Sequence, residues 1–348
     1  MRPVLVPFFI SHLGCPQRCV FCDQEKIAGA RGVLPGAEEM LARIEQYRAS
    51  SPGRGLEVAF YGGTFTALPR ADQHSLLAAL QPLLASGRLA SLRLSTRPDA
   101  VDPETACYLK SMGVGTVELG VQSMDEEVLR LSGRGHSARD AELALGALQE
   151  AGLRVGVQLM PGLPGDSEER ALFSLQLVLA LKPSFLRIYP TLVIEGTELA
   201  SLYRAGTYLP LSLDAAVTLC KRMLLAARRA GVPVLRLGLQ PTAELEAPGV
   251  LLAGPYHPAF GQLVGSELCY DLMGAMVAEL PRGSRVVFLA PAGRTSDLVG
   301  QKRKNLDRLA ERFGVLVTKV GEDTALSRSE ITLQWSGGER TWDLADLP

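Results

Sequence analysis

The sequence contains no apolar run long enough to cross a lipid bilayer, which excludes a protein held in the membrane by spanning helices. A spanning helix needs roughly 18 or more consecutive apolar residues, and the apolar N-terminal stretch is interrupted by Pro3, Pro7 and His12. The same stretch lacks the basic start and the small-residue cleavage site of a secretory signal. We therefore expect a globular, cytoplasmic protein with no membrane attachment.

The chain also lacks a surplus of charge of either sign. Its 36 Lys and Arg residues stand against 37 Asp and Glu residues, a formal net charge of -1. This balance gives no overall attraction to nucleic acid or to an anionic membrane, although it allows a local basic patch. With 348 residues, 47% of them hydrophobic, the chain is long enough for one large domain and a smaller one.

The cysteine pattern is not that of a disulfide framework. Three of the six cysteines fall within residues 15–22, whereas Cys107, Cys220 and Cys269 are scattered. Clustering of this kind is typical of a ligand set and agrees with a reducing compartment.

From residue 4 to about residue 232, short apolar β-rich runs alternate with amphipathic stretches of helical length. We predict strands at 4–10, 56–61, 91–95, 116–121, 153–160 and 185–189, and helices at 37–49, 70–85, 103–111, 138–151, 168–181 and 213–230. Six βα units indicate parallel strands with helical crossovers, because a parallel connection must return along one face of the sheet. An open doubly wound sheet and an incomplete barrel both fit, and both place the active site at the carboxyl ends of the strands. We predict an α/β fold with a partial (β/α)6 TIM-like barrel.

A shift in composition begins near Gly238, where Pro and Gly become frequent and the periodicity weakens. We expect a structured excursion there and not a flexible linker. Further strand-like and helix-like runs at 286–290, 297–313, 315–320 and 331–335 predict a small C-terminal α+β domain. The predicted division is a core domain at 1–237 and an accessory or substrate domain at 238–348.

The clustered cysteines form the pattern Cys15-x3-Cys19-x2-Cys22 directly after the first predicted strand. Three thiolates at this spacing suit an iron-sulfur cubane bound at three corners, which leaves one iron open for an outside ligand. The alternative is a zinc-stabilised binding or scaffold protein, whose structural metal normally has four closed ligands. His12 is a candidate for the fourth ligand, but the sequence offers no second pair.

Several motifs, in order along the chain, carry a family resemblance. They are GCPQRCVFCDQ at 14–24, YGGT at 61–64, ELGVQS at 118–123, GRGH at 133–136 and QLMPGLPG at 158–165. Together they resemble radical S-adenosylmethionine (SAM) enzymes, most closely the radical SAM domain of the catalytic subunit of Elongator and its bacterial relatives. A weaker likeness is to the oxygen-independent coproporphyrinogen oxidase group. The likeness covers about residues 4–235.

The resemblance implies a 4Fe-4S cluster on Cys15, Cys19 and Cys22, with SAM on its open iron. Reductive cleavage of SAM would then give a 5'-deoxyadenosyl radical that abstracts hydrogen from a substrate. The positions that match SAM contacts of the family are Phe21, Gly62, Gly63, Thr64, Glu118, Gln122, Arg134, Gln158 and Met160. Two positions depart from related domains, which often carry glutamate at Ser95 and aspartate at Gln158.

The resemblance also implies an electron donor such as flavodoxin or ferredoxin, and RNA as a candidate substrate. Residues 238–348 lack the length and pattern of the acetyltransferase-like domain of the Elongator subunit. The weaker likeness to the coproporphyrinogen oxidase group implies a small molecule or tetrapyrrole as the alternative substrate. In this region, Lys302, Arg303 and Lys304 predict either a nucleotide contact or a solvated face. His257 and Glu267 are candidates for substrate contacts or for parts of a proline-braced loop.

Overall fold

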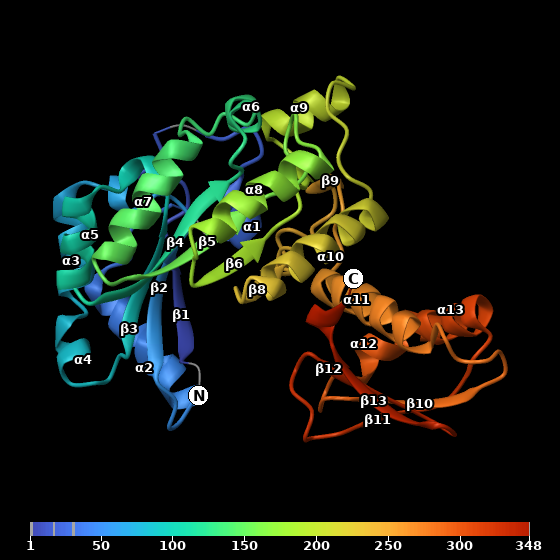
Figure 1. Cartoon of the computed structure of the whole chain (residues 1–348). Helices are drawn as coiled ribbons and strands as arrows, with labels where there is room; N and C mark the ends of the chain where they lie inside the picture. Colours follow the sequence, from blue (N-terminus) through green and yellow to red (C-terminus); the bar gives the residue numbers. More distant parts are fainter. Residues whose placement is uncertain (1–2, 17, 30–31, 348) are drawn as a thin grey trace. The chain divides into compact units, whose positions relative to one another are not determined.

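The computed structural model describes residues 3–16, 18–29 and 32–347, which fold into two compact units (Figure 1). The first unit combines 1–211 with 232–256, and the second combines 212–231 with 257–348. The segment 238–256 therefore folds with the first unit, and the functional division at residues 237 and 238 stays a prediction. In the described part, no helix is both long enough and apolar enough to span a membrane.

The first unit is built on a seven-stranded sheet in which all neighbouring strands are parallel. In spatial order the strands are β1 (Val4–Phe9), β2 (Leu56–Tyr61), β3 (Ser91–Thr96), β4 (Val114–Gln122), β5 (Arg154–Leu159), β6 (Phe185–Ile188) and β8 (Val234–Leu237). The two edge strands, β1 and β8, are not paired with each other among the described residues, so the barrel is partial. The predicted architecture is confirmed. The sequence did not predict β8, whose four residues are too few to show an alternation.

The crossovers carry helices at the predicted positions. They are α2 (Ala37–Ser50), α3 (Arg70–Ala78), α4 (Gln81–Ala85), α5 (Pro103–Ser111), α7 (Ala138–Glu150) and α8 (Glu168–Ala180), with the shorter α1 (Gln24–Ala28), α6 (Glu126–Leu131) and α9 (Glu198–Arg204) and the 3-10 turns η1 (Phe65–Ala67) and η2 (Pro98–Ala100). The predicted helix at 70–85 is in fact two helices. Pro82, near the start of α4, has no N–H with which to continue the hydrogen bonding of α3.

The strands of the sheet bury apolar residues on the face that meets the helices, and several carry polar side chains on the other face. Along β1, Val6 and Phe8 are buried, and the guanidinium of Arg43 on α2 lies 5.0 Å from the centre of the Phe8 ring. The alternate residues Leu5 and Phe9 line a cavity. The same alternation places polar side chains of four other strands on the cavity side, namely Glu57, Ser91, Arg93, Glu118 and Arg187.

The segment 238–256 is structured, as its composition predicted, and folds back on the first unit. Its strand β9 (Leu251–Ala253) pairs antiparallel with β7 (Val193–Ile194). Leu245 is buried in a small apolar cluster with residues of the β7 region. Thr242 Oγ1 also donates a hydrogen bond to the carbonyl of Ile27, 3.3 Å away. The chain after β8 is thereby joined to the chain that follows the cysteine loop.

The second unit is a small α+β fold, as predicted. Its helices are α10 (Leu213–Arg229), α11 (Phe260–Val277), α12 (Thr295–Val299) and α13 (Lys304–Phe313), and its strands pair in the order β11 (Leu316–Glu322), β10 (Arg285–Ala290), β12 (Glu330–Trp335) and β13 (Gly338–Asp343), with 3-10 turns η3 (Gln301–Arg303) and η4 (Leu344–Asp346). The single helix predicted at 297–313 is wrong. The chain breaks there because Lys302 and Arg303 adopt left-handed φ angles of 52° and 65°.

The expectation of a proline-braced loop through Glu267 also needs correction. The helix α11 begins at Phe260 and is largely buried, because its side chains are apolar nearly all round. Glu267 lies on this helix and pairs with Arg308 at 2.6 Å, while His257 Nδ1 accepts a hydrogen bond from Ala259 N at 3.0 Å. Neither His257 nor Glu267 is among the described residues that line the cavity of the first unit.

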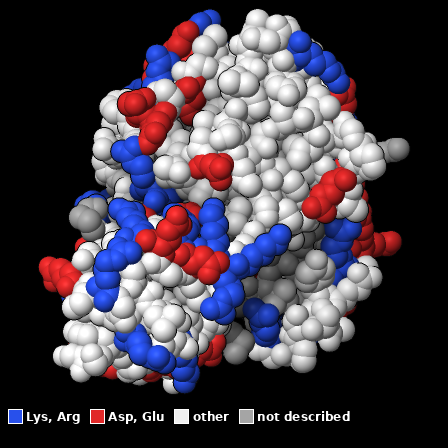
Figure 2. All heavy atoms as spheres, turned by 90° about the vertical axis from the view of Figure 1, so that its right-hand side faces the viewer, with Lys and Arg blue, Asp and Glu red and all other residues white. Residues whose placement is uncertain are grey.

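Charged side chains of both signs are interspersed on the molecular face shown in Figure 2, in agreement with the balanced composition. Lys302, Arg303 and Lys304 are all exposed. A nucleotide contact and a solvated face both remain predictions for these three side chains.

Candidate functional site

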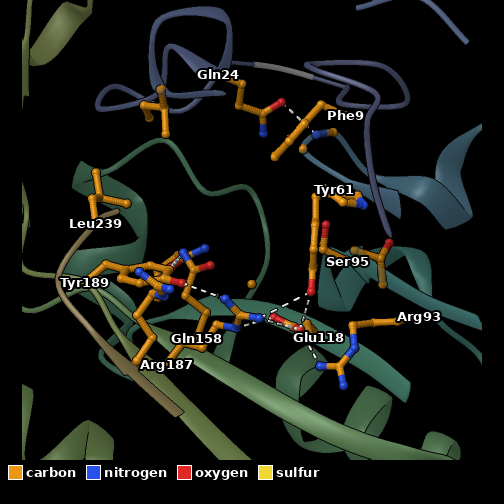
Figure 3. Close-up of a pocket in the computed structure, with 18 of the residues that line it drawn as sticks. Phe9, Gln24, Tyr61, Arg93, Ser95, Glu118, Gln158, Arg187, Tyr189 and Leu239 are labelled. Carbon is orange, nitrogen blue, oxygen red and sulfur yellow. Dashed lines mark hydrogen bonds and ion pairs between the residues drawn. The ribbon is translucent and has the colours of Figure 1, made fainter. Parts of the chain in front are cut away.

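A cavity of about 1080 Å³ lies inside the first unit, along the polar face of the sheet (Figure 3). Its wall extends from Glu57 and Ser91, near the amino ends of their strands, to the loops beyond the carboxyl ends. All twelve residues that the sequence singled out for cluster or SAM binding line this one cavity, namely Cys15, Cys19, Phe21, Cys22, Gly62, Gly63, Thr64, Glu118, Gln122, Arg134, Gln158 and Met160.

The three clustered cysteines come from one loop after β1. Backbone hydrogen bonds from Cys15 N to His12 O, 3.2 Å, and from Cys22 N to Cys19 O, 3.0 Å, close turns within this loop. Burial, together with the nearby Cys19 and Cys15, raises the pKa of the Cys22 thiol to about 12. Within the described residues, no three Cys, His, Asp or Glu side chains are grouped so as to hold a metal ion.

Two side chains from other elements contact the thiols. Arg134, in the loop before α7, donates through Nη1 to Cys19 Sγ at 3.1 Å and through Nη2 to the carbonyl of Gly120. Thr64 Oγ1 lies 3.3 Å from Cys15 Sγ. Arg134 thus places a cationic hydrogen-bond donor beside the sulfur of Cys19.

Gln24 and His12 brace the cysteine loop, a role that sequence reasoning missed although Gln24 is the last residue of the motif and His12 lies just before it. Gln24 Oε1 accepts hydrogen bonds from Gly63 N, at 2.7 Å, and from His12 N. His12 Nε2 in turn accepts a hydrogen bond from Gln24 N at 3.0 Å. That bond occupies the ring lone pair that a metal would need, so the structure does not favour His12 as a fourth zinc ligand.

The Gly62–Gly63 turn is needed for close packing against the cysteine loop. Both glycines have left-handed φ angles, of 72° and 63°. A Cβ atom added to Gly63 would lie 2.3 Å from the carbonyl oxygen of Leu13 and 2.6 Å from that of Ile10, which is closer than atoms can approach. Thr64 N also donates to Leu13 O at 2.8 Å. The predicted SAM contacts of this turn stay predictions, but its glycines already have a packing role.

A strained residue ends β4 at the cavity wall. Gln122 has a left-handed φ of 70° and sits at an irregularity in the pairing with β5. Its carbonyl accepts a hydrogen bond from Met160 N at 2.9 Å, and its Oε1 accepts one from Gln158 Nε2 at 3.0 Å. Non-glycine residues in this conformation cost free energy and are concentrated at functional sites. The strain turns the Gln122 side chain toward its partner on β5.

A network of charges, three of them buried and one partly buried, crosses the cavity wall (Figure 3). Arg93 of β3 donates to Glu57 Oε2 on β2 through Nε, 3.1 Å, and Nη2, 3.0 Å. Its Nη1 donates to Glu118 Oε1 on β4 at 2.7 Å. Arg187 of β6 lies on the other side of Glu118, with Nε 2.6 Å from Oε2. Two carboxylates and two guanidiniums therefore neutralise one another across four strands.

Two tyrosines extend this network. Tyr61, the last residue of β2, donates its hydroxyl to Glu118 Oε1 at 3.1 Å. Burial and the neighbouring Glu118 raise the pKa of Tyr61, so it remains a neutral donor. Arg187 Nη1 donates to the Tyr189 hydroxyl at 3.0 Å. Protein groups bond both carboxylate oxygens of Glu118, which gives this residue a structural role. Its contact with SAM stays a prediction.

His136 is buried next to Arg134 but is not among the described residues that line the cavity. Its Nε2 lies 3.2 Å from the carbonyl oxygen of Val121. Burial, and then the charge of Arg134, lowers the pKa of His136 to about 3. The ring is therefore neutral at pH 7, and acid titrates it first in the unfolded chain.

Acidification is expected to destabilise the fold through His136. Its pKa falls from 6.5 in the unfolded chain to about 3 in the fold, so stability is lost as the pH drops below 6.5 and continues to fall until about pH 3. Between pH 7 and pH 5 the loss should be about 2 kcal/mol. Urea unfolding at both pH values checks this: His136→Gln should lose that share of the pH dependence, and His74→Gln, on the exposed side of α3, should keep it. Equal pH dependence of wild type and H136Q would contradict the assignment.

Comparison with known protein families gives two matches along the chain. Residues 9–178 match the radical SAM superfamily, and residues 183–269 match the Radical_SAM C-terminal domain. The first match contains the cysteine loop and the sheet through β5, and the second contains β6, β8 and the segment 238–256.

Relatives and solved structures agree with these matches. The tRNA uridine(34) acetyltransferase of Methanocaldococcus infernus is 30% identical over 253 residues, which are 61% of this chain and 47% of that protein. Elongator complex protein 3 of Schizosaccharomyces pombe is 30% identical over 210 residues, 54% of this chain and 38% of that protein. The chain thus spans half or less of the length of these relatives. The solved structure of M. infernus Elp3 with an N-terminal deletion supports the fold, with a TM-score of 0.61 at 23% identity over 95% of this chain and 74% of that chain.

Proposed function

Because the chain belongs to the radical SAM superfamily, we propose that the cavity of its first unit holds a 4Fe-4S cluster and SAM and acts on RNA. The family itself implies the cluster and SAM. The observation that carries the proposal for this chain is that all twelve residues singled out by the motifs line one cavity. They come from separate segments between residues 15 and 160, and the fold brings them together at the carboxyl ends of the strands.

Cys15, Cys19 and Cys22 are the proposed ligands of the cluster. Thiolates are the ligands of iron-sulfur clusters, and three of them leave one iron of a cubane open. The donor set fits this group in its chemistry, because three thiols of one loop line one wall of the cavity and the guanidinium of Arg134 contacts Cys19. The braces from Gln24 to His12 and to the Gly63 turn would hold the loop in place before the cluster binds.

The proposed SAM site lies along the same wall. When bound, SAM supplies a 5'-deoxyadenosyl radical that abstracts a hydrogen atom from the substrate. Gly62 and Thr64 would offer backbone groups, and Gln122, Gln158 and Arg134 would offer polar side chains. The buried Arg134 Nε has no hydrogen-bond partner among the described residues, so this guanidinium has a donor to spare for a carboxylate. Phe21 and Met160 are the apolar members of the predicted set.

The remaining residues of the wall fix the shape of the cavity and keep it rigid. The network around Glu118 joins four strands, so the inner face of the sheet is held by side-chain bonds as well as by the backbone. A rigid site holds the substrate in one orientation.

RNA is the proposed substrate because the name of a relative states that it acts on tRNA. The relative from M. infernus is a tRNA uridine(34) acetyltransferase, and the matched region of this chain is shared with it. Since the chain spans less than half of that protein, the acetyl transfer is not carried over. A cytoplasmic location and an electron donor such as flavodoxin or ferredoxin are also part of the proposal.

Anaerobic reconstitution of the whole chain with iron and sulfide tests the proposal. We expect about four iron atoms per chain and the release of 5'-deoxyadenosine from SAM when dithionite is present. Addition of bulk tRNA should raise the rate of release above that without substrate, whereas a fraction of small metabolites should not.

Two outcomes would count against parts of the proposal. A folded chain that binds no iron and cleaves no SAM would reject the enzyme assignment to this cavity. Cleavage that responds to the small metabolites and not to tRNA would reject RNA as the substrate and favour a small-molecule enzyme.

A further inference from the structure

Arg236 lines the cavity of the first unit. It is on the edge strand β8 and pairs in register with Arg187 on β6. Residues paired across parallel strands point to the same face of a sheet, and both side chains line the cavity. Among the described residues, the Arg236 guanidinium has no hydrogen-bond or carboxylate partner.

The cavity wall carries more positive charge than its carboxylates neutralise. Its arginines are Arg18, Arg93, Arg97, Arg134, Arg154, Arg187 and Arg236, and its carboxylates are Glu57 and Glu118. Both carboxylates are occupied by Arg93 and Arg187. Like charges on directly neighbouring strands repel each other, and a partly buried cation without an anion is costly.

Arg97 pairs with Asp99, and Arg134 bonds Cys19 and the carbonyl of Gly120. Of the wall arginines without a partner among the described residues, Arg236 is the one that is not exposed. Arg18 and Arg154 are exposed and so are solvated, whereas Arg236 is partly buried. Solvent therefore compensates the charge of Arg236 less well. An anionic ligand would compensate it better.

The hydroxyl of Tyr189 is a donor on the same cavity wall as Arg236. The Tyr189 hydroxyl accepts a hydrogen bond from Arg187 Nη1, which leaves its own proton free to be donated. Burial raises the pKa of Tyr189, while the charges of Arg187 and Arg236 both act to lower it, so the charge of Arg236 reaches the phenol. Two guanidiniums and one hydroxyl thus present donors on one side of the cavity. Figure 3 shows Arg187 and Tyr189 on the same side, across from Arg93.

The position of Arg236 also suits a substrate that enters from the side. β8 and β1 are the two edges of the partial barrel and are not paired with each other among the described residues. A ligand group held at β8 therefore lies at the border of this gap, while Gln158 on β5 lies farther inside the sheet.

We infer that Arg236 and the Tyr189 hydroxyl form a subsite for an oxyanion of the substrate, and that this oxyanion is a phosphate of RNA. The choice of phosphate rests on the proposed function, whereas the oxyanion rests on the charges of the wall. A guanidinium is the side chain best matched to phosphate, because it donates two parallel hydrogen bonds. The subsite holds the backbone of the nucleotide at the edge of the barrel and points its base inward.

Calorimetric binding of uridine 5'-monophosphate and of uridine to the whole chain tests this subsite. The wild type should prefer the monophosphate by roughly 10-fold to 100-fold, the range for hydrogen bonds between charged groups. Arg236→Gln should remove most of this preference, and Tyr189→Phe should reduce it by several-fold. Arg154→Gln is the matched control, because it removes an exposed arginine of the same wall, and it should keep the preference. Arg236→Lys keeps the charge and should keep part of the preference.

If wild type and R236Q prefer the monophosphate over uridine equally, and circular dichroism shows that both are folded, the subsite is overturned. A wild type that does not bind the monophosphate at millimolar concentration would also overturn it. Tighter binding of succinate than of inorganic phosphate, lost in R236Q, would keep the oxyanion subsite and overturn the choice of phosphate. The proposed function fails separately, by absence of SAM cleavage in the reconstituted wild type, and that result does not alter the binding preference.

Discussion

Replacing Cys19 by alanine should abolish both cluster binding and the reductive cleavage of SAM. Two thiolates cannot hold a cubane that needs three protein ligands, so iron should fall from about four atoms per chain to a small fraction of that. Cys19 is the buried cysteine of the three and is the one that Arg134 contacts, so its loss also removes the sulfur with a defined cationic neighbour. Iron and sulfide analysis after anaerobic reconstitution, together with chromatography of 5'-deoxyadenosine, measures both effects.

Cys107→Ala is the matched control, because Cys107 is an exposed cysteine on α5 outside the cavity wall. It should keep the iron content and the SAM cleavage of the wild type. Circular dichroism of C19A before reconstitution shows whether the apo fold survives, so that loss of iron can be separated from loss of structure. A folded C19A that retains full iron and full cleavage would remove Cys19 from the ligand set.

The strands, and the grouping of the motif residues along one cavity, were predictable because both leave local signals. Apolar runs and amphipathic stretches alternate regularly, and all six strands predicted from them exist. The motif residues lie in or after strands whose carboxyl ends meet in a parallel sheet. The twelve residues that line the cavity could be grouped from the sequence without knowledge of side-chain geometry. What places them together is the topology of the sheet.

The charge network was not predictable, because it depends on strand register. Arg93 and Arg187 each interrupt an apolar strand. A single charged residue in such a run does not indicate which residue it pairs with. The partners become visible once β3 lies beside β2 and β4, which brings Glu57 and Glu118 within reach of Arg93. Of the four charged members, the sequence singled out Glu118 alone, as a SAM contact and not as the centre of this network.

The second unit shows why periodicity can fail for a helix. α11 is apolar nearly all round and contains glycines, so the sequence shows no helical stripe, and a loop was predicted through its first residues. α10 was predicted correctly as a helix, but its sequence gives no sign that it folds with the second unit. Strand and helix patterns identify elements, whereas their assignment to a compact unit depends on contacts between distant segments.

Replacing Glu118 by alanine should destabilise the first unit by about 3–5 kcal/mol, the range for removing one partner of a buried ion pair. Glu118 is 6% exposed and bonds two guanidiniums and the Tyr61 hydroxyl. Arg93 would keep Glu57, but Arg187 would lose its carboxylate and keep tyrosine hydroxyls alone among the partners described. Chemical denaturation of the cluster-free chain measures the loss. Glu45→Ala, which breaks an exposed pair with Arg88, is the control and should cost less than about 1 kcal/mol.

The double variant Glu118→Ala, Arg187→Met distinguishes charge from packing as the origin of this loss. If the loss arises from an uncompensated guanidinium, removing Arg187 as well should return much of the stability, because an apolar side chain of similar length needs no anion. If the carboxylate mattered through its volume alone, the losses of stability caused by the two substitutions would add. The double variant would then be less stable than either single variant. The second result would contradict the network as an electrostatic unit, since Glu118 would then act without regard to the cation that it faces.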